Sequence, residues 1–192
     1  MLASGSPRRR HLLSELGLEL EVRPQHLDES TLPGEDPAAY VQRLAEAKAR
    51  TDCRPGELVL GADTTVVLDG VILGKPRHAE EAREMLTALT GRRHEVLSGV
   101  ALARRVDGAL ECVSLVERSE VEIAMTPREI DWYVASSEWI DKAGAYAIQG
   151  LGSLFVPGSY GSHSNVVGLP LGALRDLFER LGEDLLAWLS PG

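Results

Sequence analysis

The chain has 192 residues, of which 44% are hydrophobic and 26% are charged, and its formal net charge is −9. This composition is typical of a globular protein, long enough to bury a core in one domain or in one elongated domain with two lobes. No apolar run reaches the length of a membrane span and no secretory pattern opens the chain, so we expect no membrane association and a cytoplasmic location. The acidic balance argues against binding a nucleic-acid polymer, but it allows a small anionic ligand in a local basic pocket.

The first half of the chain alternates helix and strand signals. A serine or aspartate followed by proline is typical of a helix start, and it predicts helices over residues 7–16 and 37–50. Between them we expect a short strand at 18–23 and an acidic loop at 25–36. The β-branched run at 58–73, turned by Asp-Gly, predicts a hairpin.

The second half continues this alternation. We expect a helix at 79–90 and strands at 94–103 and 110–124, the last two joined by a second Asp-Gly turn. The capping box "TPRE" predicts a helix from 126 to 136. A glycine-rich, loop-like segment follows at 141–168, and two helices, at 170–181 and 183–189, end the chain. Together these elements predict an α/β fold with a mixed β-sheet and flanking helices, in a single domain spanning residues 1–192.

The string "LASGSPRRR" at residues 2–10 concentrates positive charge at the start of a helix. Free backbone N–H groups and the helix dipole favour an anion there, and Arg8 and Arg9 oppose that dipole until an anion binds. The alternative is a capped helix with a solvated basic face. Ser4 belongs to the same turn, and the string does not have the pattern of a P-loop.

Further along the chain, "GADTTV" places Asp63 and Thr64 inside a β-rich run, where aspartate is a poor strand former. Such polar residues line ligand crevices in α/β sheets, although a turn carboxylate would also fit the pattern. Only three of the 20 basic residues are lysines, which are Lys48, Lys75 and Lys142, so each is a candidate position for a compact ammonium.

Lys48 and two further candidates, Glu29 and Gln149, are each open to two interpretations. Lys48 lies on the apolar stripe of its helix and either reaches the surface or binds phosphate in a cleft. Glu29 is a metal-ligand candidate or an ordinary loop carboxylate. Gln149 lies in "DKAGAYAIQG", whose small residues predict close packing, either around a ligand or within a tight structural loop.

Six strings, in order, resemble the Maf family of nucleotide pyrophosphatases, which are related in fold to the inosine triphosphate pyrophosphatases. They are "LASGSPRRR", "LAEAKAR", "GADTTV", "GKP", "DKAGAYAIQG" and "NVVGLPL", and they span residues 2–171. The resemblance implies an elongated, two-lobed α/β fold with a central cleft. It also implies hydrolysis of nucleoside triphosphates to monophosphate and pyrophosphate, a divalent cation (Mg²⁺ or Mn²⁺) and a homodimer. "ADT" and "DKAGAYAIQG" resemble the branch that acts on dTTP and UTP.

The resemblance also implies roles for single residues. Asp63 matches the proton acceptor and is a possible metal ligand, and three positions match those tied to substrate choice, namely Arg8, Thr64 and Gln149. Further cleft positions are Ser4, Arg9, Glu29, Lys48 and Lys75. One departure from the family pattern is "GSHS" at 161–164, which lengthens a loop. Two alternatives stay open: a nucleotide-binding regulator of cell division without turnover, and a pyrophosphatase directed at 7-methyl-GTP or purines.

Overall fold

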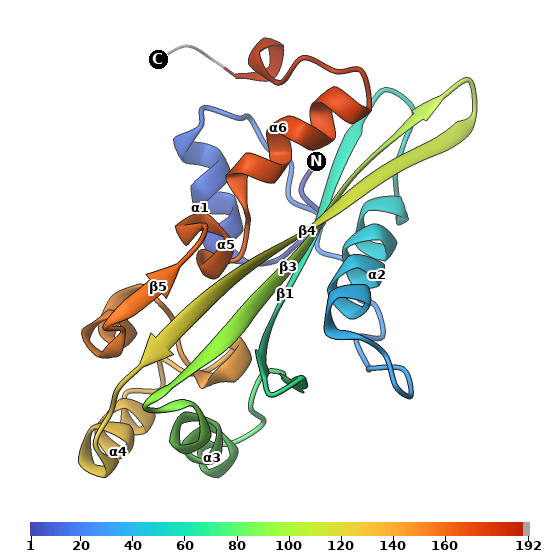
Figure 1. The fold of residues 1–192 in the computed structure, drawn as a ribbon. Coiled ribbons are helices and arrows are strands. Elements are labelled where there is room, and N and C mark those ends of the chain that lie inside the picture. The colour runs from blue at the N-terminus through green and yellow to red at the C-terminus, as the bar shows by residue number, and fades with distance from the viewer. Residues whose placement is uncertain (190–192) are drawn as a thin grey trace.

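The computed structural model describes residues 1–189, which fold around a five-stranded β-sheet of order β2-β1-β3-β4-β5 (Figure 1). Every pair of neighbouring strands is antiparallel. The strands are β1 (Leu58–Leu68), β2 (Val71–Leu73), β3 (Arg92–Val106), β4 (Ala109–Ile123) and β5 (Gly158–Tyr160). The α-helices are α1 (Pro7–Glu15), α2 (Pro37–Arg50), α3 (Ala79–Leu89), α4 (Pro127–Ala135), α5 (His163–Val167) and α6 (Leu171–Arg180). The 3₁₀ helices are η1 (Ala143–Ala145), η2 (Gly150–Phe155) and η3 (Leu185–Trp188).

Both Asp-Gly turns form the hairpins that the sequence predicts. Asp69 and Gly70 have φ values of 51° and 79°, and Asp107 and Gly108 have 52° and 84°. Positive φ at both central residues matches the right-handed twist of the strands that such a turn joins. The second turn connects β3 to β4, which pair over their whole length from Arg92 to Ile123.

The long strands β3 and β4 run through both ends of an elongated molecule (Figure 1). At one end α2 covers one face of the sheet, and α1, α5 and α6 lie on the other. At the other end α3, α4 and η1 gather around a separate hydrophobic cluster. This arrangement confirms the expected α/β fold with flanking helices and two lobes.

Alternate residues of β1 face different helices, as a strand requires. Leu58, Leu60 and Ala62 pack with α6 in one cluster, whereas Val59 packs with α2 in another. Gly61 also faces α2, where a Cβ would overlap the backbone carbonyl oxygen of Ala45. Glycine is therefore required for α2 to lie this close to the sheet.

Several sequence predictions need correction. Residues 18–23 form no strand, because the segment pairs with the main chain only through an isolated bridge between Val22 and Leu2. The segment 141–168 is more ordered than the loop we expected and contains η1, η2, β5 and α5. The helix predicted at 183–189 is present but shorter, as the 3₁₀ helix η3. The sheet was expected to be mixed, but its five strands are all antiparallel. Within the described residues, parallel pairing occurs only as isolated bridges.

No helix within residues 1–189 combines the length and the apolarity that crossing a membrane needs.

Candidate active site

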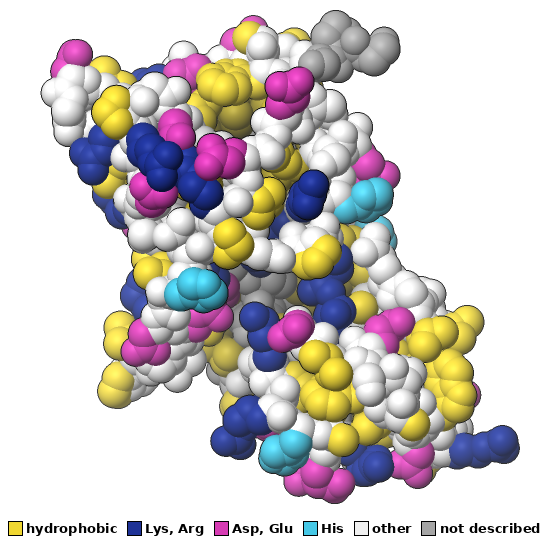
Figure 2. All heavy atoms as spheres, turned by 180° about the vertical axis from the view of Figure 1, so that it is seen from behind, with side chains coloured by type: hydrophobic (Ala, Val, Ile, Leu, Met, Phe, Trp, Pro, Cys, Tyr) yellow, Lys and Arg dark blue, Asp and Glu magenta, His cyan; other side chains and the backbone are white. Residues whose placement is uncertain are grey.

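A cleft of about 450 Å³ opens between the two lobes, against one edge of β1. At the start of β1 this edge is covered by the N-terminus, where Leu60 N donates to the Met1 carbonyl oxygen at 2.9 Å. From Val66 onward the same edge pairs with β2. Between these two pairings lie residues 61–65, so the strand presents Asp63 and Thr64 to the cleft. In Figure 2 the surface is hollowed between the lobes, and Lys and Arg side chains gather around the hollow.

The structure brings all the site residues expected from the sequence to this one cleft. The cleft is lined by Ser4, Arg8, Arg9, Glu29, Lys48, Asp63, Thr64, Lys75 and Gln149. They come from the N-terminal turn, the start of α1, the loop before α2, α2 itself, β1, and the loops that follow β2 and η1. The expected central cleft is confirmed, while the chemical role of each residue stays a prediction.

Two carboxylates converge on the ammonium of Lys48. Its Nζ lies 2.7 Å from Asp63 Oδ1 and 2.6 Å from Glu29 Oε1. Lys48 and Asp63 are both buried, so this ion pair is held in a region of reduced solvent screening. Burial raises the pKa of Glu29, but the hydrogen bond and charge of Lys48 outweigh it, and the net pKa is below its ordinary value. The lysine on the apolar stripe of α2 therefore faces the cleft and does not reach for the surface.

The Arg9 guanidinium is buried and fixed on three sides. It donates to Ser4 Oγ at 2.8 Å, to the Gly168 carbonyl oxygen at 2.8 Å and to Thr64 Oγ1 at 3.0 Å. Burial lowers the pKa of Arg9, although the negative charge of Asp63 opposes that shift. Gly168, from "NVVGLPL", was not a candidate in the sequence, because a backbone acceptor leaves no trace in residue type.

The cleft is locally basic in an acidic chain. Its lining includes five cationic side chains and three carboxylates, an excess of two positive charges, while the whole chain carries −9. All three lysines of the protein are among these cations. Lys142 is therefore a cleft residue that motif reasoning missed, although the scarcity of lysine had already marked it. Burial lowers its pKa, as does the nearby charge of Arg8.

Arg8 lies in the first turn of α1, one residue before Arg9. Burial lowers its pKa, and the carboxylate of Asp141 opposes this. The N-cap Ser6 makes no side-chain capping hydrogen bond in the described part of the chain. The cleft therefore combines free N–H groups at the start of a helix with two arginines and three lysines, and this combination suits a ligand that bears several phosphate groups.

Comparison with known proteins agrees with this geometry. A family model described as Maf-like protein matches residues 1–181. The chain belongs to this family. A dTTP/UTP pyrophosphatase of Anaeromyxobacter sp. (strain Fw109-5) is 55% identical over 100% of this chain and 93% of its own length. Proteins with the same name from Myxococcus xanthus (strain DK1622) and Moorella thermoacetica (strain ATCC 39073 / JCM 9320) are 51% and 46% identical, over 95% and 96% of this chain and 92% and 96% of their own lengths.

The "GSHS" departure from the Maf pattern forms the start of α5. Ser162 is the N-cap of this helix, and its Oγ accepts a hydrogen bond from Asn165 N at 3.2 Å. The segment lies next to Asn165, Val166, Val167 and Gly168, of which the last three line the cleft. The longer loop is thus absorbed into a capped helical turn and leaves Gly168 in contact with Arg9.

Proposed function

We propose that this chain hydrolyses dTTP and UTP to the nucleoside monophosphate and pyrophosphate. The observation that carries the proposal is the Asp63–Lys48–Glu29 arrangement beside Arg8, Arg9 and Lys75 in one cleft. Phosphoryl transfer needs charge neutralisation and positioning above all, and these cations supply both. The Maf-like relatives named dTTP/UTP pyrophosphatase support the same reaction and substrates.

Asp63 is proposed as the general base. Its Oδ1 accepts the hydrogen bond from Lys48, which leaves Oδ2 to receive a proton from an attacking water. That water breaks the P–O bond between the α- and β-phosphoryl groups, and the pyrophosphate leaves with the electron pair. Lys48 holds the carboxylate in place, and Arg9, fixed by Ser4 and Gly168, would hold a phosphate oxygen without reorganising.

A divalent cation fits this arrangement. Mg²⁺ needs only one or two carboxylates when phosphates and water complete its shell. Glu29 is the better candidate, because its side chain is 40% exposed at the cleft and it can offer such a cation an oxygen that does not pair with Lys48. No group of three or more His, Cys, Asp or Glu side chains within residues 1–189 could hold a metal by itself, so the substrate would supply the remaining ligands. When bound, the cation would neutralise phosphate charge and lower the pKa of a bound water. Whether it is Mg²⁺ or Mn²⁺ is for a metal titration to decide.

Gln149 is proposed as the residue that reads the base, with Thr64 and Arg8 shaping the pocket. Uracil and thymine present an N3–H donor beside the O4 acceptor, and a glutamine amide offers the complementary pair. Guanine presents two adjacent donors, which a carboxylate suits better. Leaving a buried edge unpaired costs about 1–3 kcal/mol, so Gln149→Glu should weaken turnover of dTTP and UTP by roughly ten- to a hundredfold.

The deciding experiment is a substrate panel with wild type and Asp63→Asn. Wild type with Mg²⁺ should release pyrophosphate from dTTP and UTP faster than from GTP or 7-methyl-GTP. Asp63→Asn should bind UTP but lose roughly 10²- to 10⁴-fold in kcat, because the amide cannot accept the proton.

Binding without turnover in wild type would instead favour the nucleotide-binding regulator, and faster turnover of 7-methyl-GTP would favour the purine-directed enzyme. Exhaustive chelation should abolish activity.

We also propose that the protein is a homodimer located in the cytoplasm. It binds no nucleic-acid polymer, and its single domain spans residues 1–192. Light scattering after size exclusion would test the dimer. A mass equal to that of one chain across the micromolar range would contradict it.

A further inference from the structure

The position of Gln149 depends on a carboxylate outside the cleft. The 3₁₀ helix η2 begins at Gly150, and Gln149 is its N-cap. The first N–H groups of a helix lack partners within the helix, and an N-cap side chain usually accepts from them. Within residues 1–189 the Gln149 side chain makes no capping hydrogen bond. Its amide is therefore not used by its own helix.

Glu138 takes the hydrogen bonds that the N-cap side chain does not. Its Oε2 accepts from Leu151 N at 2.9 Å, and its Oε1 accepts from Gly152 N at 2.9 Å. The Tyr133 hydroxyl donates to the same Oε1 at 3.0 Å. Burial raises the pKa of Glu138, but these N–H and O–H donors outweigh it and the net pKa is below its ordinary value. A charged carboxylate thus caps η2 from a different part of the chain.

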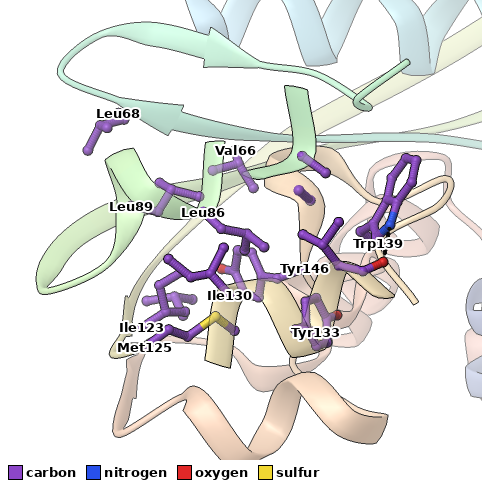
Figure 3. Close-up of a cluster of buried hydrophobic side chains, with 14 of the residues drawn as sticks. Val66, Leu68, Leu86, Leu89, Ile123, Met125, Ile130, Tyr133, Trp139 and Tyr146 are labelled. Atoms are coloured by element: carbon purple, nitrogen blue, oxygen red, sulfur yellow. Dashed lines mark hydrogen bonds between the residues drawn. The ribbon is translucent and has the colours of Figure 1, made fainter. Parts of the chain in front are cut away.

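Glu138 is itself anchored in the second lobe. The adjacent Trp139 is buried, and its Nε1 donates to the Val134 carbonyl oxygen at 2.9 Å. Figure 3 shows Tyr133, Trp139 and Tyr146 in one hydrophobic cluster, so α4 and the segment before Gln149 share a core. The carboxylate is therefore held next to the same hydrophobic cluster as the segment it caps.

The segment around Gln149 is packed against this carboxylate. A Cβ on Gly150 would lie 2.7 Å from Glu138 Oε2, and the φ of Gly150 is 70°. A Cβ on Gly152 would overlap the Ala147 carbonyl oxygen. Glycine at both positions allows the backbone after Gln149 to lie against Glu138 and Ala147, which explains the glycine that ends the string "DKAGAYAIQG".

From these contacts we propose that Glu138 is the positioning residue that sets where Gln149 presents its amide, and that it thereby sets the preference for uracil over cytosine. The inference rests on the proposed role of Gln149 as base reader. Cytosine has nearly the shape of uracil but reverses the pattern at this edge, with an N3 acceptor beside an N4 donor pair. An amide turned by 180° would suit cytosine, so discrimination between the two depends on the position and orientation in which the amide is held more than on the size of the pocket.

The test is the ratio of kcat/KM for UTP to that for CTP in Glu138→Gln. The new amide can accept one N–H but opposes the other, so the segment should shift, and displacements of this kind cost roughly ten- to a hundredfold. We expect the ratio to fall by about tenfold or more, mainly through KM for UTP. The matched control is Glu129→Gln, which disturbs a carboxylate that caps α4 through Thr126 N at 2.6 Å and does not touch η2. The control should leave the ratio unchanged.

A second arm combines Glu138→Gln with Gln149→Ala. If Glu138 acts through Gln149, the ratio in the double variant should equal that in Gln149→Ala alone. An equal loss for UTP and CTP in Glu138→Gln, or a further fall of the ratio in the double variant, would overturn the proposal. If Glu138→Gln does not fold, Glu138→Asp provides the same measurement, because its shorter carboxylate cannot reach both N–H groups as well.

The outcomes separate this inference from the function on which it rests. If wild type discriminates UTP from CTP but Glu138→Gln leaves the ratio unchanged, only the positioning role fails. If wild type does not discriminate, or if Gln149→Ala retains full discrimination, the base-reading role of Gln149 fails and the positioning role fails with it.

Discussion

Removing the ammonium of Lys48 should destabilise the protein, because it leaves buried negative charge unpaired, and Lys48→Met tests this with little change in side-chain shape. Methionine retains the apolar stem, so the substitution removes chiefly the group that bridges Asp63 and Glu29. The Asp63 side chain is only 11% exposed, so solvent compensates little for the loss of its partner. Glu29 is 40% exposed and can turn toward solvent.

The expected magnitude follows from this difference in exposure. Removing one partner of a buried ion pair costs about 3–5 kcal/mol, whereas losing an exposed pair costs about 0–1 kcal/mol. Most of the loss should therefore come from Asp63, and Lys48→Met should reduce the free energy of unfolding by about 3–5 kcal/mol. For a chain of this length, about 2–4 °C is lost per kcal/mol, so Tm should fall by roughly 6–20 °C.

Urea unfolding at pH 7, followed by circular dichroism, would measure this loss. Arg77→Met is the control, because Arg77 is 81% exposed in its pair with Glu81 and should lose no more than about 1 kcal/mol. Lys48→Met combined with Asp63→Asn should recover most of the stability, since it leaves no buried charge unpaired. The reasoning is refuted if Lys48→Met loses no more than Arg77→Met, or if the double variant is as unstable as the single one.

Three further predictions concern packing and pH. Gly61→Ala should lower the free energy of unfolding by about 1–3 kcal/mol, because its Cβ would push α2 and Lys48 away from the sheet, and it should also weaken pyrophosphate binding. The control is Gly172→Ala, whose Cβ would meet open space and should lower nothing in urea unfolding. Burial lowers the pKa of His94 to about 4, so between pH 6.5 and 4 the unfolded chain binds a proton that the folded chain does not. The free energy of unfolding should therefore fall by up to about 3 kcal/mol as pH drops from 6.5 to 4. His94→Gln should show a flatter profile of stability against pH. Because its pKa is lowered, the Glu29 carboxylate stabilises the fold at pH values above its ordinary pKa of 4.5. Glu29→Gln should therefore be less stable than wild type at pH 7, and this difference should disappear as pH falls below 4.5.

The sequence alone determined the features that depend on neighbouring residues. The Asp69-Gly70 and Asp107-Gly108 turns, the capping box at Thr126 and the proline helix starts were all predictable. Each depends on backbone dihedrals or hydrogen bonds within a few positions, and residue type constrains these directly. Most of the cleft residues were predictable for another reason, since the resemblance to the Maf family identified them before any contact was known, although it missed Lys142 and Gly168.

Only the tertiary structure decided the features that depend on distant partners. Residues 18–23 have a strand-like pattern but pair only through Leu2, and no local signal reveals which edge is available. Lys48 faces Asp63 because α2 lies close to β1. That close approach requires Gly61 on β1, since any side chain there would overlap α2. Nothing in the sequence distinguishes Glu138 from the other glutamates. It becomes the cap of η2 only because α4 and the Gln149 segment share a core. Hydrogen bonds and packing between segments far apart in the chain depend on the whole fold, and the identity of either residue alone does not encode them.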